Sequence, residues 1–99
     1  MQITSSWESY QNRARAMLEL WAAEIAHLRS KVYRQLQAGA RSEAMQRLEE
    51  LETLYRAALE QYEAMQHNSR GRVDDLRKTF EQSTDRLRQK FDELIQQIA

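Results

Sequence analysis

Residues 17–32 read MLELWAAEIAHLRSKV, and this stretch decides the fold class. Its large apolar side chains return after three or four residues, from Leu18 to Trp21, Ile25 and Leu28. That spacing places them on one face of an α-helix, whereas a half-buried strand would alternate at every second residue. The stretch therefore predicts an amphipathic helix with one buried face.

The same stripe extends in both directions and predicts a first helix over residues 5–38. Ser5 and Glu8 have the spacing of a capping box, in which the two side chains satisfy exposed amides of the first turn. Gly39 is expected to end this helix, because glycine leaves helical geometry readily and the chain contains no proline. A lone glycine costs a helix only about 1 kcal/mol relative to alanine, so one helix from Ser5 to His67 is the alternative.

Two further helices are predicted, over residues 41–67 and 71–98, separated by the turn-forming sequence His-Asn-Ser-Arg-Gly at 67–71. The chain is therefore expected to be a single all-α domain over residues 1–99. It forms either a three-helix bundle or a long antiparallel helical hairpin, with coiled-coil-like packing. The largest residues of the three stripes are expected to form the core or an interface: Trp7, Trp21, Ile25, Leu28, Leu48, Leu51, Tyr55, Tyr62, Phe80, Leu87 and Phe91.

Composition limits the classes of function. The 99 residues include no cysteine, which excludes disulfides, and 15 basic residues balance 15 acidic ones. A balanced chain has no overall field that would attract nucleic acid or an anionic bilayer. No signal peptide and no membrane-spanning helix are predicted, because no apolar run approaches the roughly 20 residues that a span needs. We expect a cytoplasmic protein.

Few residues suggest chemistry. Glu24 and His27 have the Glu-x-x-His spacing of di-iron bundles, but such a site needs a second copy and two more glutamates. Carboxylate pairs such as Glu49-Glu50 point in different directions on a helix, so a solvated face explains them better than catalysis. Basic residues from Arg70 onward are interspersed with acidic ones, which is typical of an exposed, ion-paired face. We expect no enzyme, no cofactor, no metal, no small-molecule substrate and no nucleic-acid partner.

The segment from Tyr10 to Lys31 contains Leu18-x-x-Trp21-x-Ala23-Glu24-Ile25 and resembles the opening of a family of small bacterial coiled-coil proteins. The resemblance covers nearly the whole chain, and some members of the family are described as stress-response proteins. The third segment keeps the family's frame, with Val73 in place of its aromatic residue. The resemblance implies an all-helical coiled-coil protein without a known reaction, and it carries no catalytic residue across.

The wide apolar stripes predict that association is the function. We expect a non-enzymatic helical interaction or scaffold protein that forms homo-oligomers or binds another helical protein through amphipathic faces. Stress response enters only through the resemblance. The alternative is a peripheral membrane protein that binds a lipid surface through the third helix, where Phe80 and Phe91 share one face.

Overall fold

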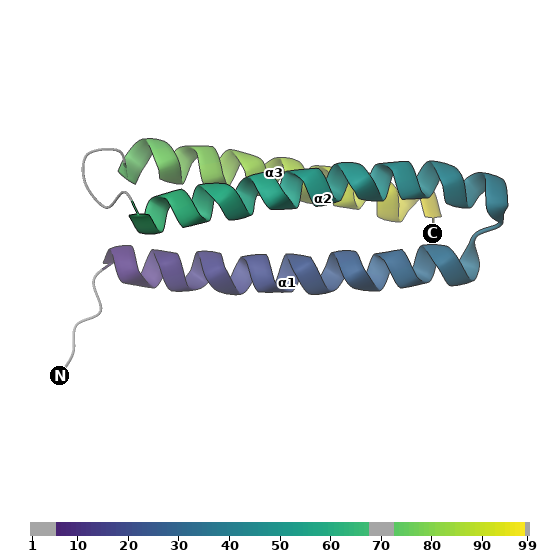
Figure 1. The fold of residues 1–99 in the computed structure, drawn as a ribbon, viewed down its shortest axis with the longest axis horizontal. Coiled ribbons are helices and arrows are strands. Elements are labelled where there is room, and N and C mark those ends of the chain that lie inside the picture. The colour runs from purple at the N-terminus through teal and green to yellow at the C-terminus, as the bar shows by residue number, and fades with distance from the viewer. Residues whose placement is uncertain (1–5, 68–72, 99) are drawn as a thin grey trace.

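A computed structural model describes residues 6–67 and 73–98 of the chain, and these residues form three α-helices (Figure 1). The helices are α1 (Ser6–Gln35), α2 (Ala38–His67) and α3 (Val73–Ile98). Figure 1 shows that α1 and α3 run in one direction and α2 in the other. The all-α prediction is confirmed, and of the two predicted architectures the structure shows the three-helix bundle. The molecule is elongated and measures 53 × 28 × 19 Å.

The break between α1 and α2 comes before Gly39. The first helix ends at Gln35 rather than at residue 38, and the second begins at Ala38 rather than at residue 41. Leu36 packs against the core, and its carbonyl accepts a 3.0 Å hydrogen bond from the guanidinium of Arg41. This bond satisfies a backbone acceptor that the end of α1 leaves free. Packing and capping therefore set the turn, and Gly39 lies in the first turn of α2.

Two sequence expectations fall on residues that the structure does not describe. The proposed N-cap, Ser5, precedes the described part of the chain, which begins with α1 at Ser6. Residues 68–72 hold most of the expected loop and lie outside the described residues too. The alternative of one helix from Ser5 to His67 is wrong, because α1 and α2 are separate helices that lie side by side (Figure 1).

The core is divided along the length of the bundle into two apolar clusters. The first lies toward the α1–α2 turn, and its buried members are Ile25, Leu28, Val32, Ala44, Leu48, Leu51, Leu87 and Leu94. The second lies toward the start of α1, and its buried members are Ala14, Leu18, Ala58, Tyr62, Met65 and Phe80. Tyr55 packs against both clusters and joins them. The core is therefore continuous and draws on all three helices.

The bundle is asymmetric. Helix α2 packs closely along both of the others, while α1 and α3 approach each other less closely. Aromatic side chains bridge this wider seam: Tyr10 meets Phe80 with ring centroids 6.5 Å apart, and Trp21 meets Phe91 at 5.2 Å, both edge to face. Aromatic pairs favour this edge-to-face geometry. Two rings also bridge a wider gap between helices than two aliphatic side chains can. The seam between α1 and α3 is the one where a hollow can remain.

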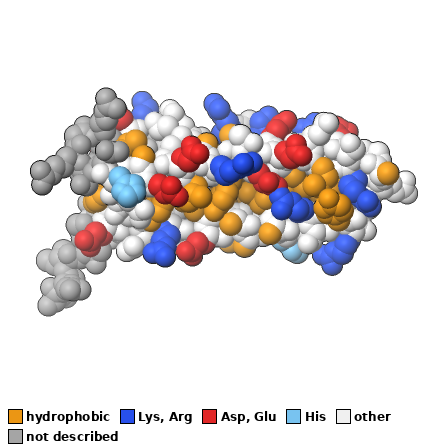
Figure 2. Space-filling model, in the orientation of Figure 1, with side chains coloured by type: hydrophobic (Ala, Val, Ile, Leu, Met, Phe, Trp, Pro, Cys, Tyr) orange, Lys and Arg blue, Asp and Glu red, His pale blue; other side chains and the backbone are white. Residues whose placement is uncertain are grey.

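Charged side chains cover the outside of the bundle. Figure 2 shows hydrophobic side chains in a band between α1 and α2 on one face, with basic and acidic groups on either side of the band. An ion pair between Arg29 of α1 and Glu52 of α2 crosses this seam. Pairs within one helix, such as Arg15 with Glu19, are mostly exposed and contribute little stability each. The apolar core therefore holds the fold together.

Candidate functional site

The predicted core or interface residues pack against each other within the bundle of a single chain. Ile25, Leu28, Leu48, Leu51 and Leu87 are buried in the first cluster, with Trp21 and Phe91 packed against it. In the second cluster, Tyr62 and Phe80 are buried and Trp7 packs against them, while Tyr55 touches both clusters. The large side chains of the three stripes thus meet each other within the bundle. A surface for partners has to be sought among the residues that remain outside.

One hollow lies between α1 and α3, near the start of both helices. It has a volume of about 320 Å³ and is lined by Tyr10, Arg13, Ala14, Met17, Arg77, Phe80 and Glu81. Its position follows from side-chain size: aromatic rings bridge the wide seam at Tyr10, whereas the small side chain of Ala14 leaves space behind it. We call this hollow the α1–α3 groove. It has apolar walls and a charged rim.

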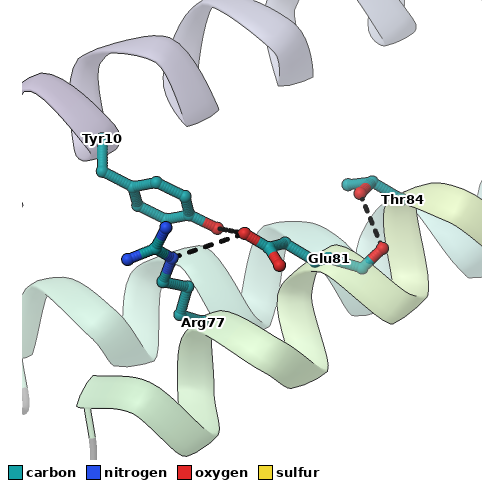
Figure 3. A network of polar contacts seen from close by, with 4 residues as sticks. All are labelled: Tyr10, Arg77, Glu81 and Thr84. Carbon is teal, nitrogen blue, oxygen red and sulfur yellow. Dashed lines mark hydrogen bonds and ion pairs between the residues drawn. The ribbon is translucent and has the colours of Figure 1, made fainter.

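Three polar residues of the groove, Tyr10, Arg77 and Glu81, form a connected network (Figure 3). The hydroxyl of Tyr10 donates a hydrogen bond of 3.1 Å to Oε1 of Glu81, and Nε of Arg77 lies 3.4 Å from the same oxygen. The guanidinium of Arg77 also lies over the ring of Tyr10, 4.6 Å from its centroid. Arg77 and Glu81 are one helical turn apart on α3, so both reach the same residue of α1. The network ties α1 to α3.

The environment of Tyr10 favours its neutral form. Burial beside Phe80 and the negative charge of Glu81 raise the pKa of the Tyr10 phenol to about 12, and the guanidinium of Arg77 opposes this effect only in part. The hydroxyl therefore stays protonated and donates its hydrogen bond at every physiological pH. This chemistry suits a structural donor. A general base needs a pKa near the working pH, which Tyr10 does not have.

Arg13 is the cation of the rim that has no partner among the described residues. It is exposed on α1, and no described carboxylate or carbonyl accepts a hydrogen bond from it. Arg77 is compensated by Glu81. The charged groups of the rim are two arginines and one glutamate, so the α1–α3 groove carries one uncompensated positive charge beside an apolar wall.

Two other hollows are more open to solvent. One, of about 620 Å³, lies between α2 and α3 and is lined by acidic residues of α2 and by Arg86 and Lys90 of α3. The other, of about 280 Å³, lies on the α1–α2 seam beside the ion pair of Arg29 and Glu52. The first has two acidic and two basic residues and no aromatic wall, whereas in the second Arg29 pairs with Glu52 and Arg56 donates a hydrogen bond to the carbonyl oxygen of Glu52. The α1–α3 groove is therefore the candidate small-ligand site.

The outward face of α1 is the second candidate surface. Two large apolar side chains are well exposed among the described residues, Leu20 at 60% and Tyr33 at 54%. The guanidinium of Arg41 lies over the ring of Tyr33, 5.7 Å from the ring centroid. Leu20 has no such explanation. It lies in an exposed row with helical spacing that we call the outer row: Ala16, Leu20, Ala23, His27 and Ser30.

The residues considered for metal binding lie apart from the hollows. Glu24 and His27 are both exposed on α1. Within residues 6–67 and 73–98, no three or more histidine or acidic side chains lie together in an arrangement that could bind a metal ion. Across the same residues, no helix combines the length and the apolar character that crossing a membrane requires.

The sequence analysis did not identify the groove network. Tyr10 appeared only at the start of the segment that carries the family resemblance, and Arg77 only among the interspersed charges that follow Arg70. The bond from Tyr10 to Glu81 joins residues that are 71 positions apart, and helical spacing cannot reveal such a contact. The available signal was a tyrosine on a buried stripe, whose hydroxyl requires a polar partner.

No family model, no curated protein and no solved structure matches this chain. The resemblance to small bacterial coiled-coil proteins therefore stays a prediction.

Proposed function

We propose that the protein is a non-enzymatic helical interaction module that self-associates through the outer row of α1. The observation that carries this proposal is the exposure of Leu20, a large apolar side chain at the centre of a helix whose other leucines are buried or half-buried. The core does not use this residue. An exposed leucine in a row of small side chains is the pattern by which two helices approach closely.

The spacing of the outer row fits a second copy of the same helix. Its members follow one another at intervals of four, three, four and three residues, the alternation of a coiled-coil seam. In an antiparallel pair centred between Leu20 and Ala23, each Leu20 packs against the Ala23 of the other copy. In this two-fold symmetric pair, both copies use the same surface, the outer row, as the interface.

The charges beside the outer row support the same register. Glu19 and Glu24 flank the outer row on opposite sides. With that centre, the flanking residue nearest to Glu19 on its side of the seam is Ala26 of the other copy, and the one nearest to Glu24 on the other side is Met17. No two glutamates face each other. If the two helices shifted so that the two-fold axis passed through Ile25, Glu24 of one copy would lie beside Glu24 of the other. Like charges in contact destabilise a helix pair. Charge therefore selects the register in which the leucines and alanines interlock.

The association is expected to be weak. A stable interface buries about 800 Å² on each partner, and a row of alanine, serine and one leucine buries considerably less. The dimer should therefore form at high protein concentration and dissociate on dilution. A transient pair of this kind suits an interaction module that exchanges partners, including another helical protein with a similar face.

The test is the molar mass from light scattering over a wide range of protein concentration. We expect the mass to rise from that of the 11.8 kDa monomer toward twice that value. Leu20→Glu should keep the chain monomeric at every concentration, because it places a charge in the seam. Gln89→Glu adds the same charge at an exposed position of α3 and serves as the matched control. A wild-type mass that stays monomeric would refute the proposal, as would equal association of both variants.

The alternative of lipid-surface binding has less support. It relies on the apolar face of α3, but Phe80 is completely buried and Phe91 packs against Trp21. Helix α3 would have to leave the bundle before this face could meet a membrane, and the core would lose several of its buried residues. The link to stress response derives from the family resemblance alone and is part of the proposal.

A further inference from the structure

We infer that the α1–α3 groove binds a small monoanion with an apolar body, such as a medium-chain or aryl carboxylate. This inference concerns a different surface from the outer row of α1 and does not depend on self-association. It rests on the groove's volume, on its apolar wall and on the charge of Arg13, with which no described residue forms an ion pair. Each of these three properties limits the ligand in a different way.

The volume limits the size of the ligand. Pockets for small molecules usually range from about 300 to 1,000 Å³. The groove, at about 320 Å³, lies at the lower end of that range. It can hold a ligand with a short chain or one ring, and it is too small for a nucleotide or a long lipid chain. The ligand class is therefore small.

The wall requires an apolar body. Phe80 is fully buried and Ala14 is nearly so, while Met17 is half-buried beside them. The apolar surface that water still reaches in the hollow belongs to Met17 and Tyr10, and methionine adapts its shape to irregular ligands. A hydrocarbon chain or an aromatic ring would remove this surface from water, which is the main favourable contribution to binding in such a groove.

The rim requires one negative charge. Glu81 accepts bonds from Tyr10 and Arg77 through Oε1, so Arg77 is already compensated. Arg13 lines the opposite side of the groove and makes no ion pair with a described residue. A guanidinium binds a carboxylate through two parallel hydrogen bonds. A monoanion would compensate the charge of Arg13. The second negative charge of a dianion would have no cation to pair with and would be repelled by the carboxylate of Glu81.

The network of Tyr10 also prepares the groove. Trp7 stacks on Tyr10 with ring centroids 5.8 Å apart, and Phe80 meets its edge, so the ring is fixed on both sides. The hydrogen bond to Glu81 fixes the direction of the hydroxyl (Figure 3). A wall that is already ordered loses little conformational entropy when a ligand binds.

The experiment is a titration of ¹⁵N-labelled protein with octanoate, followed by amide chemical shifts. We expect saturable shifts that cluster at the residues of the groove, at Tyr10, Ala14 and Phe80 among others. The uncharged analogue 1-octanol should bind the same residues about tenfold more weakly, because it cannot pair with Arg13. The full chain at low concentration is used, so that the outer row of α1 stays unoccupied.

Arg13→Gln separates a specific site from general adsorption. It should weaken octanoate binding about tenfold and leave the affinity for 1-octanol unchanged. Arg15→Gln removes the same charge from the same helix, but Arg15 pairs with Glu19 and lies outside the groove, so it is the matched control. Equal loss in the two variants would overturn the inference, and so would shifts spread over the surface or the absence of shifts at Tyr10 and Phe80.

Discussion

Replacing Tyr10 with phenylalanine tests the network that ties α1 to α3. The substitution removes one oxygen atom and with it the 3.1 Å hydrogen bond to Oε1 of Glu81. The ring keeps its stack on Trp7, its edge contact with Phe80 and the guanidinium of Arg77 above its face. Any change in stability therefore reports the hydroxyl alone.

The expected loss at neutral pH is about 1 kcal/mol. A hydrogen bond to a charged group contributes roughly 1.5–3 kcal/mol when it is sheltered from water. Here the side chains of Arg77 and Glu81 are 50% and 52% exposed, and solvent screening reduces the contribution. With a urea m-value of about 1–2 kcal/mol/M for a domain of this size, the midpoint of unfolding should fall by about 0.5–1 M.

The pH dependence gives a sharper test. The pKa of Tyr10 is raised to about 12 in the folded protein, first by burial and then by the charge of Glu81, against about 10 in the unfolded chain. Below pH 10 the phenol is protonated in both states, so its contribution is fully present. Between pH 10 and 12 the unfolded chain releases the proton and the folded one does not, so the free energy of unfolding falls as the pH rises.

The magnitude of this fall follows from linkage. A difference of two pKa units corresponds to about 2.7 kcal/mol, and because Tyr10 is only partly buried, screening reduces the expected value to about 1 kcal/mol. The phenylalanine variant lacks this titration. Its stability should therefore be lower than that of the wild type at pH 7 and should approach it between pH 10 and 12.

The assay is urea unfolding followed by circular dichroism at pH 7, 9, 10 and 11. Tyr33→Phe is the control, because Tyr33 is 54% exposed and its hydroxyl makes no hydrogen bond to a described residue. Every other ionisable group of the wild type is present in the Tyr10 variant as well, so the difference between these two proteins reports Tyr10. Parallel curves for the wild type and the Tyr10 variant up to pH 11 would refute the proposed role of the hydroxyl.

Two further substitutions test the fold. Gly39→Ala should stabilise the protein by about 0.5 kcal/mol and raise the Tm by a few degrees in a thermal melt, because Gly39 is helical and nothing lies within 4 Å of an added methyl group; a lower Tm would mean that the turn needs glycine. Leu48→Ala should cost about 3 kcal/mol in urea unfolding, because Leu48 is completely buried and the substitution leaves a cavity. A loss below about 1 kcal/mol would show that this part of the core is loosely packed.

The apolar spacing was sufficient to predict three helices and the buried face of each. Apolar spacing in each segment identifies the buried face because every turn of a helix returns to it, and Leu28, Leu48 and Leu87 are buried accordingly. The position of the first break was predicted less well. A glycine signals that a helix can end, but the actual end depends on Leu36 reaching the core and on Arg41 capping its carbonyl.

The α1–α3 groove could not be predicted from the sequence. It exists because α1 lies farther from α3 than from α2, and the relative distances of helices depend on side-chain packing among all three. Ala14 leaves a hollow only when Tyr10 and Phe80 bridge the same seam nearby. Apolar spacing shows which face of a single helix is buried. It does not show which small residue on that face will lie beside a space between two helices.

The shape of the bundle determines which solution measurement can decide its state of association. A compact chain of this length has a radius of gyration of about 13 Å, whereas this single chain already has 16.1 Å over its Cα atoms. A large radius therefore does not indicate an oligomer, because a monomer of three long helices is elongated by itself. The large apolar residues are used within the core, and Leu20 remains outside it. The proposed association through Leu20 is therefore expected to be weak, and molar mass as a function of concentration would distinguish a dimer from the elongated monomer where the radius cannot.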